Sequence, residues 1–239
     1  MRREFTANVS HELKTPLHTI AGYAEFLANN AVAAEDIPGF SQQIFSEARR
    51  MTALVDDIIR LSHLDEGASD MEREDVDLTQ IAREVVDGLQ PFAAELGVGL
   101  TLTGERAPMN GIRQSLNLMI RNLCDNAIKY NKRGGSVNVN IENGPEEILL
   151  TVSDTGIGIA PELQDRVFER FYRVDKGRSR AMGGTGLGLS IVKHTALLHH
   201  AQIDLSSIPD EGTTVTIRFP KIAEAAKPYS MGRPFGNTP

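Results

Sequence analysis

The residues best suited to covalent chemistry lie near the start of the chain, where His11 and Glu12 are followed by Thr15 and Pro16. A carboxylate beside an imidazole can accept the proton on one ring nitrogen and so raise the nucleophilicity of the other. Apolar residues around this pair recur at steps of three or four, which predicts an amphipathic helix: Phe5, Val9, Leu13, Leu17, Ile20, Ala24 and Leu27. At about 100° per residue, His11 falls nearly opposite this stripe and Thr15 shares its face. His11 is therefore expected to be exposed.

The alternative interpretation of an isolated surface histidine is a solvated side chain with no role in chemistry. The neighbours of His11 favour a role in covalent chemistry. Pro16 lacks the N–H that would bond the carbonyl of Glu12, so the helix is expected to bend at the reactive pair. His18 lies on the same face, but Thr19 follows it instead of an acid, and we interpret it as a bystander.

A second polar group is predicted on a helix from about residue 112 to residue 130. Asn122, Asn126 and Lys129 are spaced four and three apart and share one edge of this helix. An amide oxygen can ligate Mg²⁺, and a lysine ammonium can neutralise phosphate. The trio therefore suits a metal-bound polyphosphate, although a solvated polar face would have the same pattern.

Two glycine-rich stretches follow. Asp154 ends a hydrophobic run and precedes Gly156 and Gly158, so backbone can approach a flat ligand while the carboxylate accepts a hydrogen bond from an amino group such as that of adenine. The run 183–189 (GGTGLGL) opens a helix, where glycines and exposed N–H groups form an anion site. Taken alone, such a glycine-rich turn can equally be an ordinary loop.

The combination of these motifs resembles a known family. The stretch 9–17 (VSHELKTPL) resembles the phosphoacceptor box of sensor histidine kinases. Five further stretches resemble the N, G1, F, G2 and G3 boxes of histidine kinase ATP domains, in the family's order: 122–130 (NLCDNAIKY), 154–158 (DTGIG), 168–173 (FERFYR), 184–189 (GTGLGL) and 212–214 (GTT). The resemblance extends from about Arg2 to Lys221, and it implies the catalytic core of a sensor histidine kinase.

The resemblance implies roles for individual residues of the phosphoacceptor box. His11 would receive the γ-phosphoryl group of ATP, Glu12 would be its base, and Thr15 would hold the water that dephosphorylates a partner. The phosphoryl group would then pass to an aspartate of a response regulator.

The resemblance also implies a Bergerat-type ATP site. Asn126, assisted by Asn122, would hold Mg²⁺; Lys129 and Arg173 would contact phosphates; Tyr130 would lie by the base; and Asp154 would accept from the adenine amino group. The remaining nucleotide-binding positions are Gly156, Gly158, Gly184, Gly186, Leu187, Gly188 and Thr213, and residues 174–183 would form a lid.

Composition restricts the other classes of function. The chain has 239 residues, 41% of them hydrophobic, with a net charge of −7 and a pI near 5.4. This acidic balance argues against a dedicated nucleic-acid or anionic-membrane binder.

Cys124 is interpreted as a small apolar filler, and His194, His199 and His200 lack the nearby Cys or carboxylate that a zinc site would need. No stretch is apolar enough to span a membrane, and no N-cap residue precedes Phe5 at the start of the first helix. We therefore expect a cytoplasmic fragment whose parent protein continues upstream into linker, sensor and membrane segments.

These motifs require a multidomain α and α/β architecture. A second periodic helix over residues 40–64 predicts an antiparallel hairpin (residues 1–66), and its excess apolar surface predicts a dimeric four-helix bundle. A linker is expected between Asp65 and Asp77. Residues 67–222 mix helices and strands without a strict repeating order, which predicts a layered α/β sandwich. In this domain, Asp77 and Gln80 are expected to cap a helix that Gly97 ends. The segment 223–239 is rich in Pro and Gly and predicts a disordered tail.

Two other functions are compatible with parts of this pattern. A Bergerat-fold ATPase without phosphohistidine chemistry would share the nucleotide boxes, but it would not require His11, Glu12 and Thr15. A dimerisation and docking module would keep the hairpin, but it would not require Asn126.

Overall fold

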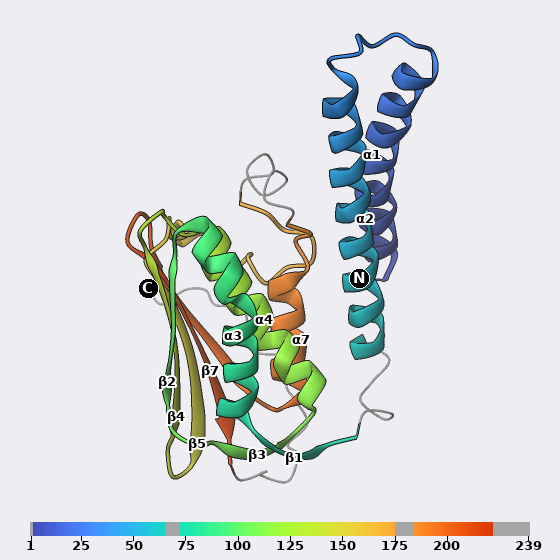
Figure 1. Ribbon diagram of the computed structural model, residues 1–239. Coiled ribbons are helices and arrows are strands. Elements are labelled where there is room, and N and C mark those ends of the chain that lie inside the picture. Colours follow the sequence, from blue (N-terminus) through green and yellow to red (C-terminus); the bar gives the residue numbers. More distant parts are fainter. Residues whose placement is uncertain (1, 66–71, 175–183, 222–239) are drawn as a thin grey trace, which may run out of the picture.

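The computed structural model describes residues 2–65, 72–174 and 184–221, and Figure 1 shows them as a helical hairpin beside an α/β domain. The predicted lid, apart from Val174, and the predicted tail lie outside these residues. Within the described part of the chain, none of the helices combines the length and apolar character needed to cross a bilayer.

The hairpin consists of two long helices packed side by side, α1 (Arg2–Ala28) and α2 (Ile37–Asp65). Both predicted helices are confirmed, and α2 begins three residues earlier than the pattern indicated. The helix α1 continues through Pro16, which is buried. Thr15 and Thr19 each donate a side-chain hydrogen bond to the carbonyl four residues back, at 3.2 Å.

The second domain is built on a five-stranded sheet in the order β2-β4-β5-β7-β6. Its strands are β2 (Gly99–Gly104), β4 (Ser136–Asn143), β5 (Glu147–Asp154), β6 (Gln202–Ile208) and β7 (Gly212–Pro220). Only the β2–β4 pair is parallel. All five match strands that the sequence predicts from runs of apolar residues, which mark the face of each strand turned to the core: Leu100–Leu102, Val137–Ile141, Ile148–Val152, Ile203–Leu205 and Val215–Phe219.

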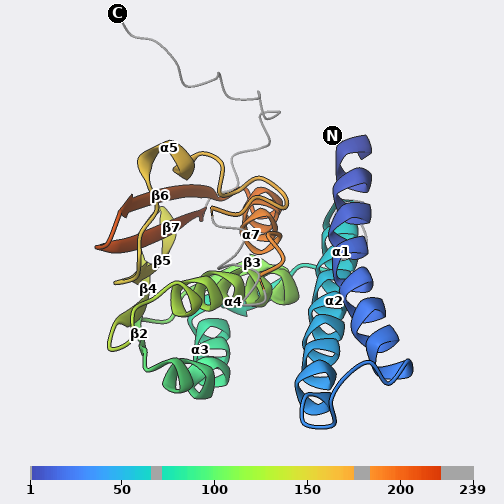
Figure 2. The same ribbon diagram turned by 90° about the horizontal axis from the view of Figure 1, so that it is seen from above.

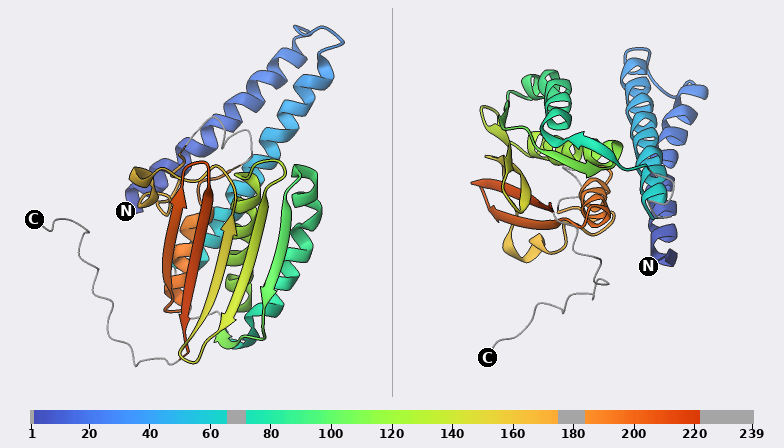
Figure 3. Two further views of the ribbon diagram at one scale, coloured as in Figure 1. Left: turned by 90° about the vertical axis from the view of Figure 1, so that its left-hand side faces the viewer. Right: turned by 90° about the horizontal axis from the view of Figure 1, so that it is seen from below.

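Three helices cover one face of this sheet: α3 (Leu78–Leu96), α4 (Arg113–Lys129) and α7 (Gly188–Leu198). Figures 2 and 3 show the sheet, the helical layer and the hairpin as successive layers. The buried core lies between the sheet and the helices. A short helix, α5 (Pro161–Gln164), precedes the loop that leads to Arg173. The predicted α/β sandwich is confirmed.

The linker prediction needs a correction at its C-terminal end. Residues Glu74–Asp77 form strand β1, which pairs antiparallel with β3 (Pro108–Gly111) in a separate two-stranded sheet. Both strands have four residues, and Val76 is the buried side chain of β1. Their pairing depends on segments more than 30 residues apart, so the local pattern carries no signal for it.

The predicted ends of α3 are confirmed. The Asp77 carboxylate accepts from the Thr79 N–H at 3.0 Å and from the Ala107 N–H at 3.2 Å, so one cap holds two backbone segments. Gly97 ends the helix in the left-handed conformation, with φ of 68°. Gln80, however, donates to Glu84 instead of completing a capping box with Asp77.

His199 ties the end of α7 to the start of α4. Its ring is buried, with Nδ1 2.8 Å from the Thr195 carbonyl and Nε2 accepting from the Ile112 N–H at 3.0 Å. Because the Ile112 bond requires an unprotonated Nε2, this ring is the neutral form that donates through Nδ1. Nδ1 therefore fixes the ring on α7, and Nε2 joins it to the start of α4, the helix that carries the predicted polar edge.

Candidate functional site

A cavity of about 410 Å³ opens between α4, the end of β5, the loop before α7 and the hairpin helix α2. Most of the nucleotide-site residues predicted from sequence line it together: Asn122, Asn126, Lys129, Tyr130, Asp154, Gly158, Arg173, Gly184, Gly186, Gly188 and Thr213. Gly156 and Leu187 are not among its lining residues.

The edge of α4 turns its polar side chains to this cavity because its opposite side, with Leu116, Ile120 and Ile128, is buried in the core. Asn122 uses its amide nitrogen to donate to the Leu118 carbonyl at 2.9 Å. Its oxygen is directed to the start of α7, where a Cβ at Gly188 would lie 2.8 Å from it. The Lys129 ammonium is 2.7 Å from the carboxylate of Asp125 one turn earlier. Amide oxygens and a positioned ammonium thus face one space.

This donor set fits a magnesium ion that is shared with a substrate polyphosphate. Among the residues that the structure describes, no cluster of three or more His, Cys, Asp or Glu side chains could hold a metal by itself. Mg²⁺ commonly uses few protein ligands and takes the others from phosphates and water. The neutral oxygens of Asn122 and Asn126 match that mode.

Asp154 lies at the end of β5, where one oxygen, Oδ1, accepts from the Gly156 N–H at 2.8 Å and the Thr213 N–H at 3.3 Å. Burial raises the pKa of Asp154 above its ordinary value, although these two hydrogen bonds act in the opposite direction. Since both backbone bonds use Oδ1, the second carboxylate oxygen can accept from a ligand amino group.

Glycines shape the floor beside Asp154. Gly158 has φ of 64°, and a Cβ there would lie 2.0 Å from the carbonyl oxygen of Ile208, so only glycine fits this turn. Gly156 does not line the cavity but packs on Tyr130, where a Cβ would lie 2.4 Å from the carbonyl oxygen. Its contribution is to hold Asp154 and Tyr130 together.

Leu187 also acts outside the cavity. It is fully buried in an apolar cluster with Ile191 of α7 and with Leu54 and Leu61 of α2. The structure therefore places this residue of the predicted nucleotide box at the contact between the α/β domain and the hairpin. The G2 and F segments are joined directly as well, because the Phe171 N–H donates to the Gly186 carbonyl at 2.8 Å.

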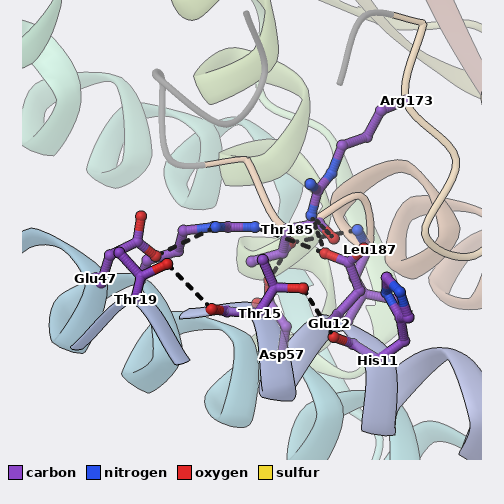
Figure 4. Close-up of polar contacts among 10 residues, drawn as sticks. His11, Glu12, Thr15, Thr19, Glu47, Asp57, Arg173, Thr185 and Leu187 are labelled. Carbon is purple, nitrogen blue, oxygen red and sulfur yellow. Dashed lines mark hydrogen bonds and ion pairs between the residues drawn. The ribbon is translucent and has the colours of Figure 1, made fainter. Parts of the chain in front are cut away.

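His11 is exposed on α1, as its spacing predicted. Figure 4 shows the polar contacts around it. The Glu12 carboxylate pairs with Arg173 at 3.0 Å and with Arg50 at 3.6 Å, and no hydrogen bond between Glu12 and the His11 ring occurs among the described contacts. Arg173 also donates to the Thr185 carbonyl at 2.9 Å. The predicted base is therefore held by arginines, one of them from the wall of the cavity.

Several residues at this site were not found from sequence. Ala53, Asp57 and Arg60 of α2 line the cavity. Thr185 Oγ1 donates to Asp57 at 2.7 Å, and burial raises the pKa of this carboxyl despite that bond. No motif marks these residues, because their role depends on α2 packing against the loop before α7.

Two family models match the chain. The model described as His Kinase A (phospho-acceptor) domain matches residues 1–67, and that described as histidine kinase-, DNA gyrase B-, and HSP90-like ATPase matches residues 111–223. The chain belongs to the sensor histidine kinase family. Its family is the one that the sequence resemblance indicated.

Individual relatives agree with this assignment. The kinase core is 41% identical over 228 residues to the sensor-like histidine kinase SenX3 of Mycobacterium tuberculosis, covering 94% of this chain and 55% of that protein. The chain thus spans about half the length of this relative. Among solved structures, full-length ShkA in complex with AMPPNP is 26% identical, with a TM-score of 0.65 over 92% of this chain and 46% of that one. The histidine kinase ThkA in complex with the response regulator TrrA shares the fold, at 20% identity and a TM-score of 0.72 over 93% of this chain and 63% of that one.

Proposed function

We propose that this kinase core binds ATP with Mg²⁺, transfers the γ-phosphoryl group to His11 and passes it to an aspartate of a response regulator. One observation carries the proposal. A cavity with amide, ammonium and carboxylate groups lies against a helical hairpin that exposes His11, and Glu12 and Arg173 connect the two. The AMPPNP complex of ShkA supports a nucleotide as the ligand of this cavity.

The proposed ligand contacts follow from the cavity wall. Asp154 accepts from the adenine amino group, and Tyr130 lies by the base. Lys129 and Arg173 neutralise phosphate oxygens, while Asn126 and Asn122 hold the metal. Mg²⁺ supplies neutralisation of phosphate charge when it is bound. In phosphoryl transfer the protein mainly positions the donor and stabilises charge, which matches this set of residues.

The transfer step requires the His11 imidazole and Glu12 together. A lone pair on one ring nitrogen forms the bond to the γ-phosphorus while the bond from that phosphorus to the β–γ bridging oxygen breaks. ADP leaves with that electron pair, and the proton on the other ring nitrogen passes to the Glu12 carboxylate. Both ion pairs of Glu12 use Oε2, so Oε1 is the oxygen that would take this proton.

We propose a division into the hairpin (residues 1–66), the ATP domain (67–222) and a tail (223–239). The segment between Asp65 and β1 is the proposed hinge, since the acceptor and the ATP lie on different domains and must approach each other.

We propose that the hairpin forms a homodimer. Several large apolar side chains of the hairpin are 40–57% exposed in the single chain: Leu17, Phe26, Ile37, Phe45, Val55 and Ile59. Two hairpins packed face to face would cover such residues in a four-helix bundle. Light scattering coupled to gel filtration tests this, and a monomer at micromolar concentration would contradict it.

We propose a response-regulator receiver domain as partner, with ThkA bound to TrrA as the supporting precedent. No nucleic acid takes part in this reaction.

Thr15 is the proposed residue for regulator dephosphorylation, and Thr15→Ala should impair that reaction while it leaves labelling of His11 intact. We propose a cytoplasmic location, because the reaction uses ATP.

Incubation with γ-labelled ATP tests the central proposal. The expected label is stable to base, labile to acid, and lost in both His11→Gln and Asn126→Ala. Mixing the two variants restores label if transfer crosses the dimer. Hydrolysis of ATP without any label on the protein would favour the ATPase alternative. Full function in Asn126→Ala would favour a docking module.

A further inference from the structure

Arg50 of α2 is a buried arginine whose role no motif indicates. Its side chain is 8% exposed and lies between two carboxylates. Nη1 donates to Glu47, one turn earlier on the same helix, at 3.3 Å, and Nη2 is 3.6 Å from the Glu12 oxygen Oε2 on α1. Arg50 therefore links the two helices of the hairpin at the level of the phosphoacceptor.

The same oxygen of Glu12 is shared by two guanidinium groups. Arg173 contacts Oε2 at 3.0 Å and is only 6% exposed, while the Glu12 side chain is 23% exposed. Together, Arg50, Arg173, Glu12 and Glu47 form a partly buried group of two positive and two negative charges. Desolvated carboxylates are held in place by such partners, because an unpaired buried charge is costly.

The two arginines differ in what they are attached to. Arg173 belongs to the ATP domain, lines the cavity and also donates to Thr185, so it moves with that domain. Arg50 belongs to the hairpin and is anchored by Glu47 on its own helix. When Arg173 turns to a nucleotide phosphate, Arg50 is the cation of this group that stays beside Glu12.

We propose that Arg50 is a positioning residue for histidine phosphorylation, which retains the Glu12 carboxylate beside His11 after Arg173 has moved to the nucleotide. This inference rests on the proposed function. Glu12 still takes the imidazole proton during transfer, and Arg50 contributes by restricting the rotamers of that carboxylate. Arg50 does not line the cavity, so its effect falls on the transfer step and not on nucleotide binding.

The test measures labelling of His11 by ATP in the full chain. It yields the rate constant at saturating ATP and the ATP concentration at which the labelling rate is half-maximal. Arg50→Gln should lower the rate constant about 10- to 100-fold, the effect expected when a catalytic group is misplaced by about 1 Å. The ATP concentration at half-maximal rate should change by less than about threefold, because the substitution leaves the contacts that bind the nucleotide unchanged. Arg50→Lys retains the charge and should recover most of the rate.

Arg49→Gln is the matched control, because Arg49 is the adjacent exposed arginine and stacks on Phe45. It should label at the unsubstituted rate. Melting temperatures of all variants separate positioning from folding. The inference is overturned if Arg50→Gln labels His11 as fast as Arg49→Gln does, or if it changes only the ATP concentration at half-maximal rate. It is also overturned if the labelling rates of Arg50→Gln and Arg50→Lys follow the melting temperatures of these variants. Absence of label on His11 in the unsubstituted chain refutes the proposed function and this inference with it.

Discussion

Glu12 and Arg173, 161 residues apart in the sequence, form an ion pair of 3.0 Å between the phosphoacceptor helix and the wall of the nucleotide cavity. The pair joins the proposed base to a proposed phosphate ligand. Both side chains are largely shielded from water, so screening by salt weakens their attraction only in part. We expect a nucleotide phosphate that binds Arg173 to compete with Glu12 for this guanidinium.

The first prediction concerns competition for Arg173. Glu12→Gln removes the carboxylate that holds this guanidinium, so AMPPNP should bind more tightly, by about fivefold for an ion pair worth about 1 kcal/mol. Labelling of His11 should be lost in the same variant. Calorimetric titration with AMPPNP and Mg²⁺ measures the change. Glu35→Gln, in the exposed turn of the hairpin, is the control, and unchanged or weaker binding by Glu12→Gln would refute the competition.

The second prediction separates ligand binding from stability at Asp154. Burial raises the pKa of this carboxyl, so the folded state binds a proton more readily than the unfolded state does. The ionised carboxylate therefore destabilises the fold at neutral pH, and this cost disappears as the pH falls through the raised pKa.

Asp154→Asn should accordingly melt at a higher temperature than the unsubstituted protein at pH 7, with a difference that shrinks toward pH 4. Its Oδ1 can still accept from Gly156 and Thr213, but its amide nitrogen would face the adenine amino group as a second donor. Nucleotide affinity should fall about 10- to 100-fold. Calorimetric melting and nucleotide titration give the two readouts, and retained affinity would show that Asp154 does not bind the base.

The third prediction compares two glycines. Gly158→Ala places a Cβ against the Ile208 carbonyl at positive φ, which should lower the free energy of unfolding by about 1–3 kcal/mol and weaken nucleotide binding. Gly88→Ala lies in the exposed interior of α3 with open space around it, and it should raise stability by about 0.5–1 kcal/mol. Urea unfolding measures the free energy of unfolding of both variants. An equal change in the two variants would mean that the turn at Gly158 can relax.

The fourth prediction concerns His199. Burial lowers the pKa of His199 from 6.5, so the unfolded state binds a proton first and stability is lost as the pH falls through 6.5. His199→Leu should cost about 1–3 kcal/mol at pH 7.5, because the buried Ile112 N–H loses its acceptor. The difference from the unsubstituted protein should narrow toward pH 5.5 in thermal melts.

His200→Asn, at the exposed neighbouring position with φ of 55°, removes a ring whose charge helps to lower the pKa of His199, so it should weaken the pH dependence of the unsubstituted protein without abolishing it. A constant difference between His199→Leu and the unsubstituted protein across this pH range would show that His199 does not titrate with unfolding.

Local chemistry made much of this core predictable. The steps of three and four in α1 and α2, the alternation in β4 and β5, and the left-handed Gly97 depend on interactions within a few residues, so the sequence determined these elements directly. The polar edge of α4 was predictable for the same reason. Asn122, Asn126 and Lys129 share a face through helical geometry alone, whatever packs against it.

Tertiary structure decided the contacts between distant segments. The pairing of β1 with β3, the burial of Leu187 against α2, and the convergence of Arg50 and Arg173 on Glu12 all depend on how separate elements pack. Such contacts leave no periodic signal, because each partner has an ordinary pattern in its own element. The sequence thus determined which groups can react, and the packing of the ATP domain against the hairpin decided which of those groups meet.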